Sequence, residues 1–266
     1  MEIKGILHCH STYSYDAKLS LRELKDLFKA EGMHFVCMTE HTDMMTVERA
    51  DAFVKECEAL SDETFRFIPG FEIPYKRTHV LMIGARNFCG NFAPTGEELA
   101  TWAREAKFIV LAHPVRNNFS VDATLLAHLD GLEVWNQQYE GKRVPRTRSI
   151  KLFKDLKTKK PELVATGGLD LHRKEHNGTP NIIMDVVTLT EDNIIEKLRT
   201  GAFTISSDRA HMYGTLPNVD EIIKKYFLES AFSVAVIVLG KTVSKTCASL
   251  GITLPAWLRR GVRSRL

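Results

Sequence analysis

The chain has 266 residues, of which 44% are hydrophobic and 26% are charged. This composition is typical of a folded globular protein, and it excludes a disordered chain, a collagen-like chain and a small disulfide scaffold. The length fits one large α/β barrel or two smaller domains. Because no run of eighteen apolar residues occurs, we expect no membrane-spanning segment.

The cysteine pattern and the N-terminus predict a cytoplasmic protein. The five cysteines are scattered along the chain and form no Cys-x-x-Cys pair, which is typical of a reducing compartment. The sequence starts directly with an apolar strand pattern and lacks the charged and apolar regions of a secretion signal. No pattern in the sequence indicates an oligomeric state.

The charge is unevenly distributed along the chain. Residues 241–266 contain six basic and no acidic side chains, so the rest of the chain is slightly acidic despite the net charge of +3. A slightly acidic body is a poor surface for duplex nucleic acid, which we therefore do not expect as a partner. We interpret the basic tail as a solvated terminus, with contact to an anionic surface or partner as the alternative.

Short apolar runs alternate with amphipathic runs along most of the chain. The predicted strands are Ile3–Leu7, Phe35–Thr39, Phe65–Pro69, Val80–Ala85, Phe108–Ala112, Gly131–Trp135 and Leu163–Thr166. The predicted helices are Leu21–Ala30, Val47–Leu60, Glu97–Ala106, Pro145–Lys157 and Asp192–Thr200. Ser20 with Glu23 predicts a capping box at the first helix, and Thr95 predicts the start of the third. This alternation favours parallel strands in a single barrel-like domain.

Residues 227–240 are apolar nearly all round a helix. We interpret them as a buried helix that packs on the barrel and ends at Gly240, with an interfacial or dimer-forming helix as the alternative. The predicted domains are therefore a barrel over residues 1–215 and a C-terminal helical extension with a basic tail over residues 216–266.

Histidines and carboxylates gather at the ends of the predicted strands. His8 and His10 end the first strand, where a spacing of two residues places both imidazoles on one face. The other members of the set are Asp16, His41, Glu72, His79, His113, Asp170 and His172. The carboxyl ends of parallel barrel strands meet on one face, so we expect all nine side chains in a single site. Imidazole and carboxylate ligands without thiolates suit Zn, Mn or Fe, and nine ligands are enough for two or three ions.

In this order the motifs resemble the PHP (polymerase and histidinol phosphatase) family over residues 1 to about 210. The motifs that carry the resemblance are His8-x-His10, Asp16, Thr39-Glu40-His41, Glu72, His79, Ala112-His113-Pro114 and Asp170-x-His172. The resemblance implies a distorted (βα)7 TIM-like barrel, the PHP fold, with a trinuclear metal centre. The implied ligands are His8, His10, Glu72 and Asp170 for one ion, Glu72, His79 and His113 for a second, and Asp16, His41 and His172 for a third.

The resemblance also implies hydrolysis of a phosphate ester, such as a small phosphorylated metabolite, a nucleotide or a short oligonucleotide. We hypothesise in-line attack by a hydroxide that the ions activate, with Glu72, Asp170 and Arg116 as catalytic residues. Phosphate also requires cationic donors, for which the candidates are Arg116, Arg143, Arg148 and His211. Two alternatives stay open, which are a metal-dependent amidohydrolase and a metal-binding barrel without catalysis.

Overall fold

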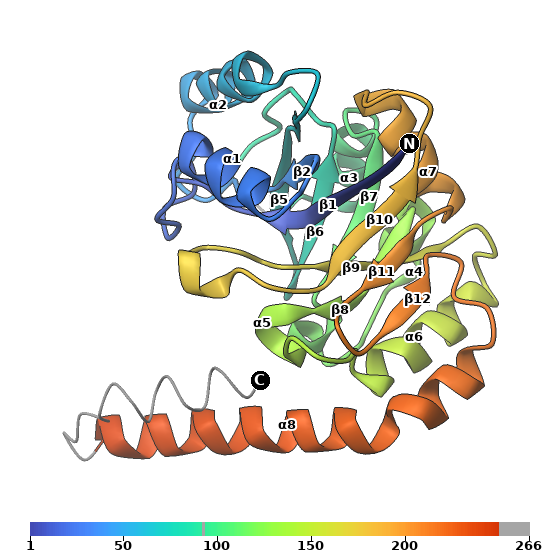
Figure 1. Ribbon diagram of the computed structural model, residues 1–266. Helices are drawn as coiled ribbons and strands as arrows, with labels where there is room; N and C mark the ends of the chain where they lie inside the picture. Colours follow the sequence, from blue (N-terminus) through green and yellow to red (C-terminus); the bar gives the residue numbers. More distant parts are fainter. Residues whose placement is uncertain (92–93, 250–266) are drawn as a thin grey trace.

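The computed structural model describes residues 1–91 and 94–249 (Figure 1). The strands are β1 (Glu2–Cys9), β2 (Phe35–Met38), β3 (Glu40–His41), β4 (Arg66–Ile68), β5 (Gly70–Tyr75), β6 (Thr78–Ile83), β7 (Phe108–Ala112), β8 (Gly131–Asn136), β9 (Val164–Gly168), β10 (Asn181–Asp185), β11 (Thr204–Ser206) and β12 (His211–Tyr213). The helices are α1 (Leu21–Ala30), α2 (Val47–Leu60), α3 (Gly96–Ala103), α4 (Ala123–His128), α5 (Gln137–Glu140), α6 (Thr147–Lys157), α7 (Glu191–Thr200), α8 (Val219–Ser249) and the short 3₁₀ helices η1 (Pro114–Asn117) and η2 (Lys174–His176).

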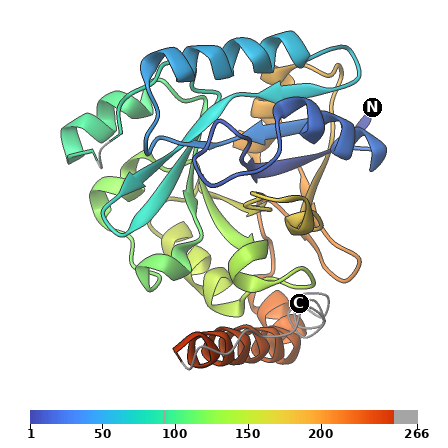
Figure 2. The same cartoon turned by 90° about the vertical axis from the view of Figure 1, so that its left-hand side faces the viewer.

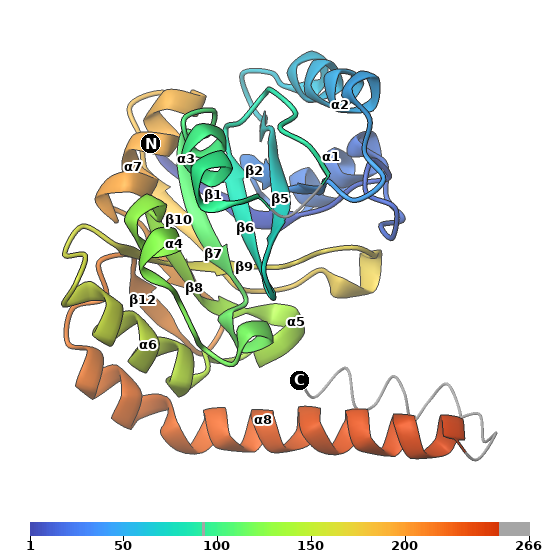
Figure 3. The ribbon, with the colours of Figure 1, turned by 180° about the vertical axis from the view of Figure 1, so that it is seen from behind.

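The fold is a mixed α/β structure with two sheets. Within the described residues, the strand orders are β12-β11-β10-β1-β2-β4 and β3-β5-β6-β7-β8-β9. On one side, β2 continues into β3 and β4 into β5 through the single residues Thr39 and Pro69. On the other side, the backbone N–H of Asp170 donates to the carbonyl oxygen of His8 at 2.8 Å. The second sheet is therefore linked to the first near both of its edge strands, β3 and β9, and helices surround the two sheets in the views of Figures 2 and 3.

The strand pairing is mixed, so the prediction of parallel pairing is wrong in part. The pairs β1–β2, β7–β8 and β8–β9 are parallel, whereas β5–β6 and β6–β7 are antiparallel. Only Lys76 and Arg77 separate β5 from β6, and two residues are too few for the crossover that parallel strands need. As a consequence, His79 at the start of β6 pairs with Ala112 at the end of β7 and reaches the same rim.

Most predicted elements are found, and the strands that were not predicted are β3, β5, β10, β11 and β12. Helices α1 and α2 and strand β7 have the predicted bounds. Ser20 and Glu23 form the expected capping box, and Thr95 caps α3. Strands β11 and β12 have three residues each, which is too short for an alternating pattern to stand out. Glu72 lies inside the separate strand β5, not at the end of the preceding strand as predicted.

Helix α8 differs most from its prediction. It continues through Gly240 without ending there, and its apolar side chains are not buried as expected, since Leu228 is 80% and Leu239 is 63% exposed. The helix is longer than the surface of α5 and α6 that it contacts, where Tyr226 is buried, so its far half projects past them (Figure 1). Most of the predicted basic tail, residues 250–266, lies outside the described residues. None of the helices in the described part of the chain is long and apolar enough to cross a membrane.

Candidate metal centre

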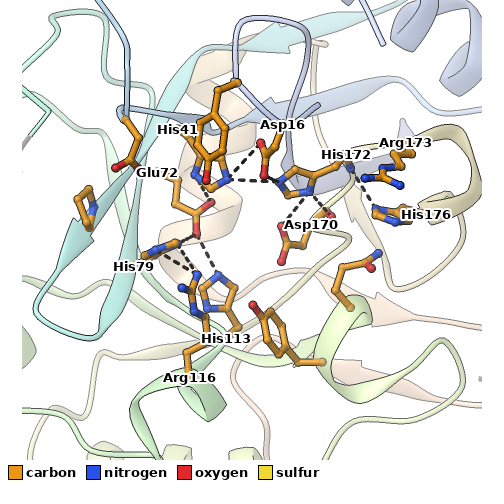
Figure 4. A pocket seen from close by; sticks show the side chains of 15 residues that line it. Asp16, His41, Glu72, His79, His113, Arg116, Asp170, His172, Arg173 and His176 are labelled. Atoms are coloured by element: carbon orange, nitrogen blue, oxygen red, sulfur yellow. Dashed lines mark hydrogen bonds and ion pairs between the residues drawn. The ribbon is translucent and has the colours of Figure 1, made fainter. Parts of the chain in front are cut away.

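A cavity of about 470 Å³ lies at the rim where β5, β6, β7 and β9 come together (Figure 4). Its lining residues are Tyr15, Asp16, His41, Asp43, Glu72, Pro74, His79, His113, Arg116, Gln138, Tyr139, Asp170, His172, Arg173 and His176. Seven of the nine predicted metal ligands are among them. The other two, His8 and His10, are fully buried against Glu72 and Asp170. The structure therefore brings the whole predicted set together.

Glu72 is the centre of this set. Its Oε1 lies 2.5 Å from Nδ1 of His79 and 2.9 Å from Nε2 of His113. The nitrogens within 3.3 Å of its Oε2 are Nε2 of His8, Nε2 of His10 and Nδ1 of His41. Each oxygen of one buried carboxylate thus faces its own group of imidazoles.

Asp170 completes the first group of potential ligands. Its Oδ1 lies 3.4 Å from Nε2 of His8 and 3.6 Å from Nε2 of His10. His8, His10, Glu72 and Asp170 each offer a ligand atom, and these atoms all lie within 4.8 Å of one another. Two ligands bound about 2.1 Å from one ion are roughly 3 Å apart, so this spacing fits a shared cation.

A further group lies around His172, on the other side of His41 from Glu72. Nε2 of His172 is 3.3 Å from Oδ2 of Asp16 and 3.3 Å from Nε2 of His41. The same Nε2 of His41 is 3.8 Å from Oδ1 of Asp16, while its Nδ1 faces Glu72. The geometry also brings His10 close to His41 and His172. His41 therefore stands between the Glu72 group and the Asp16 group.

Several ligand atoms in this site have no hydrogen-bond partner among the described residues. Nε2 of His10, Nδ1 of His41 and Oδ1 of Asp16 are all buried and unpaired in this sense. Buried polar atoms are costly unless something satisfies them. Cations placed between these donor atoms would satisfy them, so the residues present fit a metal centre.

The backbone of the ligand-bearing segments is unusual. β1 has a shift in its pairing with β2 between Leu7 and Cys9, and His8 between them has a φ of 61°. His8 and His10 therefore converge on Glu72 through a strand irregularity, not through the simple alternation that we predicted. His113 and Asp170 also have positive φ values, 26° and 53°. Such conformations in residues other than glycine are concentrated at functional sites.

Burial and close charges shift the pKa values of the site in opposite directions. Burial alone would raise the pKa of Glu72, but His8 and His79 hold it well below its usual range. Burial would lower the pKa of His10, but the carboxylates of Asp170 and Glu72, both within 3.6 Å of its Nε2, raise it to about 9. Burial, reinforced by the charge of His10, lowers the pKa of His41 to about 3. The central carboxylate thus stays ionised and able to bind cations.

Glu133, in the middle of β8, supports His8 and His113 from behind. Its Oε1 is 2.7 Å from Nδ1 of His8. Its Oε2 accepts hydrogen bonds from the backbone N–H of His113 at 2.7 Å and from Nδ2 of Asn136 at 3.0 Å. A carboxylate on the far nitrogen of a ligand imidazole fixes its tautomer and orientation. The sequence analysis did not single out Glu133, although a lone acid in an apolar strand was a usable signal.

Glu40 supports His10 in a similar way. The hydroxyl of Ser14 donates to Oε2 of Glu40 at 2.5 Å and lies 3.2 Å from Nδ1 of His10. The backbone N–H and the hydroxyl of Ser11 also bind Glu40, at 2.9 and 2.6 Å. Glu40 is fully buried, and it therefore helps to orient the ligands without facing the cavity.

Arg116 is the predicted substrate residue that the structure places in the cavity. Its Nη1 lies 3.1 Å from Nε2 of His79. Arg173, which directly follows the Asp170-x-His172 motif and was not predicted, also lines the cavity. Figure 4 shows the two guanidinium groups on opposite sides of the ligand cluster.

Arg143, Arg148 and His211, all within the described residues, do not line this cavity. The guanidinium of Arg148 lies 4.3 Å from the ring centre of Phe119, and Nδ1 of His211 lies 2.9 Å from Oγ of Ser206. His211 belongs to the edge strand β12, which does not contribute to the cavity lining. These three predictions rested on sequence position alone, which does not determine where a side chain points.

Comparison with known proteins agrees with this geometry. A family model described as PHP domain matches residues 7–230, a range that includes all nine predicted ligands. The chain belongs to the PHP family. The resemblance inferred from the sequence motifs is thereby confirmed. No curated protein sequence matches the chain.

Several solved structures have a similar fold. A two-domain protein from Bacteroides vulgatus, described as containing a predicted PHP-like metal-dependent phosphoesterase, matches with a TM-score of 0.57 and 16% identity over 80% of this chain and 66% of its own. PsfC from Pseudomonas syringae matches at 0.52 and 17% identity, with coverage of 86% and 98%. The lesion-specific endonuclease PfuEndoQ from Pyrococcus furiosus matches at 0.53 and 18% identity, with coverage of 80% and 58%. This PHP chain thus spans less than two thirds of two of these proteins, and identities this low show the fold alone.

Proposed function

We propose that this PHP protein hydrolyses phosphate esters with the help of divalent metal ions. The observation that carries the proposal is the position of Glu72. Its Oε1 faces His79 and His113, and its Oε2 faces a separate group that includes His8 and His10. A carboxylate with nitrogen ligands at both oxygens is suited to bridge two adjacent ions.

We assign the nine side chains to as many as three ions. The sets are His8, His10, Glu72 and Asp170 for the first ion, Glu72, His79 and His113 for the second, and Asp16, His41 and His172 for the third. Their mixture of imidazole and carboxylate suits Zn, Mn or Fe. Ions held in this way lower the pKa of water toward neutrality and offset the charge that develops on phosphoryl oxygens.

The chain's own residues have distinct tasks in this proposal. Glu72 and Asp170 stay ionised, which keeps the cluster of imidazoles attractive for cations. Arg116, on one side of the cluster, donates hydrogen bonds to the substrate phosphate, and Arg173 on the other side provides a second cationic donor. Arg143, Arg148 and His211 are not part of the proposal, since they lie outside the cavity.

The dimensions of the cavity favour a small substrate. A volume of about 470 Å³ is within the range of small-molecule sites. We therefore propose a phosphorylated metabolite or a nucleotide as the substrate, with the protein acting in the cytoplasm. We also infer that the two sheets form a distorted (βα)7 barrel over residues 1–215. They are linked where β2 continues into β3 and where Asp170, after β9, binds the backbone of His8 in β1.

Phosphatase assays on the purified chain test the proposal. After chelation and reloading with Mn, Zn or Fe, we expect release of p-nitrophenol from p-nitrophenyl phosphate. Glu72→Gln should lose activity and bound metal together, whereas Glu196→Gln, at an exposed position on α7, should keep both. Hydrolysis of amide substrates in place of phosphate esters would identify an amidohydrolase. Stoichiometric metal without turnover of a panel of phosphate esters would identify a non-catalytic barrel.

A further inference from the structure

Helix α8 presents an exposed apolar face. The large apolar side chains exposed along it are Phe227, Leu228, Phe232, Val238, Leu239 and Val243. Successive residues of a helix are about 100° apart, so these six fall within about half of its circumference. The buried residues Tyr226 and Ser230 lie on the other side, toward α5 and α6. The exposed face is therefore on the side of α8 that points away from α5 and α6.

No other helix or strand in the described part of the chain carries more than one large apolar side chain of similar exposure. Those outside α8 are Met1, Tyr15, Met44, Val47, Val187 and Tyr213. Single exposed apolar residues are normal on protein surfaces, whereas a contiguous group marks an interaction site. The group on α8 thus requires a partner with an apolar region.

Basic residues accompany this face along α8. Lys224 and Lys225 are exposed where the apolar face begins. Between residues 224 and 249, α8 contains four basic residues and one acid, Glu229, whose Oε1 lies 3.7 Å from Nη1 of Arg209. The acids in its first turn are Glu221 and Asp220, and Oδ2 of Asp220 lies 2.7 Å from Nζ of Lys154. An apolar helix face with basic residues along it matches a surface that is apolar inside and anionic outside.

We propose that α8 binds the surface of an anionic membrane. Apolar side chains of an interfacial helix enter the boundary between headgroups and acyl chains, while lysine and arginine bind acidic headgroups. A second copy of this chain fits less well, because pairing two α8 helices in either direction places basic residues against basic residues. The anionic lipid surface satisfies both features at once.

Sedimentation with lipid vesicles tests this inference on the full chain. We expect binding to vesicles of phosphatidylcholine mixed with phosphatidylserine, weaker binding in high salt, and little binding to phosphatidylcholine alone. The double variant Phe232→Ser/Leu239→Ser should bind about tenfold more weakly. Val187→Ser, a change at an apolar residue that is 89% exposed on another part of the surface, should bind like the wild type. All three proteins should have the same thermal unfolding temperature, since the altered side chains are exposed.

Three results would overturn the inference. The first is absence of binding to the anionic vesicles. The second is equal binding to the neutral vesicles, which would remove the role of the basic residues. The third is a dimer in light scattering without lipid that Phe232→Ser/Leu239→Ser dissociates, which would make a second copy the partner of this face.

Discussion

Glu133→Gln tests whether the support behind the metal ligands matters. The carboxylate accepts from Nδ1 of His8, the backbone N–H of His113 and Nδ2 of Asn136. Glutamine has one acceptor oxygen, so one side of this network must face an amide N–H and loses its hydrogen bond. A hydrogen bond to a charged group contributes about 1.5–3 kcal/mol. If this cost falls on the metal-bound state, metal affinity drops about 10- to 100-fold.

Competition against a chromogenic chelator measures this affinity directly for Zn and Mn. Excess metal should restore occupancy and, with it, activity, because the ligand side chains themselves are intact. Glu196→Gln is the matched control, since it removes the same charge at an exposed position. The reasoning is refuted if Glu133→Gln unfolds at the wild-type temperature and binds both metals with wild-type affinity.

Three other perturbations have expected outcomes. Gly168→Ala would place a Cβ 2.0 Å from Oε1 of Glu133, so it should destabilise the fold by about 1–3 kcal/mol in denaturant titrations, whereas Gly96→Ala, with its nearest contact at 3.2 Å, should be tolerated. Burial raises the pKa of Glu140 to about 8. The wild type therefore loses stability as the pH rises from about 5 to 8, where the unfolded chain has already released this proton. Glu140→Gln lacks this loss, so its free energy of unfolding relative to wild type should rise by up to about 4 kcal/mol over that range, and equal slopes for both proteins would disprove the assignment. Chelation should lower the melting temperature, and adding Mn at about 100 times its Kd should restore about 2.7 kcal/mol; an unchanged melting curve would count against metal held only by the folded state.

The side chains of the candidate metal centre could be grouped from the sequence because their residue types are unusual at the ends of apolar strands. Such a residue can be recognised even where the predicted fold is wrong in part. His79 shows this, since it reaches the rim on an antiparallel strand that the alternation of strands and helices did not predict. The structure brings His79 to the predicted cluster although the predicted direction of its strand was wrong.

Other features could not be predicted because they depend on three-dimensional direction. Arg148 and His211 were proposed from their positions in the sequence, but neither lines the cavity. The exposure of Leu228 follows from its place on the face of α8 opposite the buried Tyr226, and apolar periodicity does not contain that information. Local patterns predict what a segment is, whereas the surrounding elements decide what it contacts.

The left-handed backbone at His8, His113 and Asp170 has a consequence for how sequences of this kind can diverge. Each such conformation costs roughly 1–2 kcal/mol in a residue with a side chain, and glycine adopts it without that cost. Mutational drift toward glycine at these positions would relax the backbone while removing a ligand. Glycine at these three positions is therefore the change to expect first in relatives that lack the proposed metal chemistry.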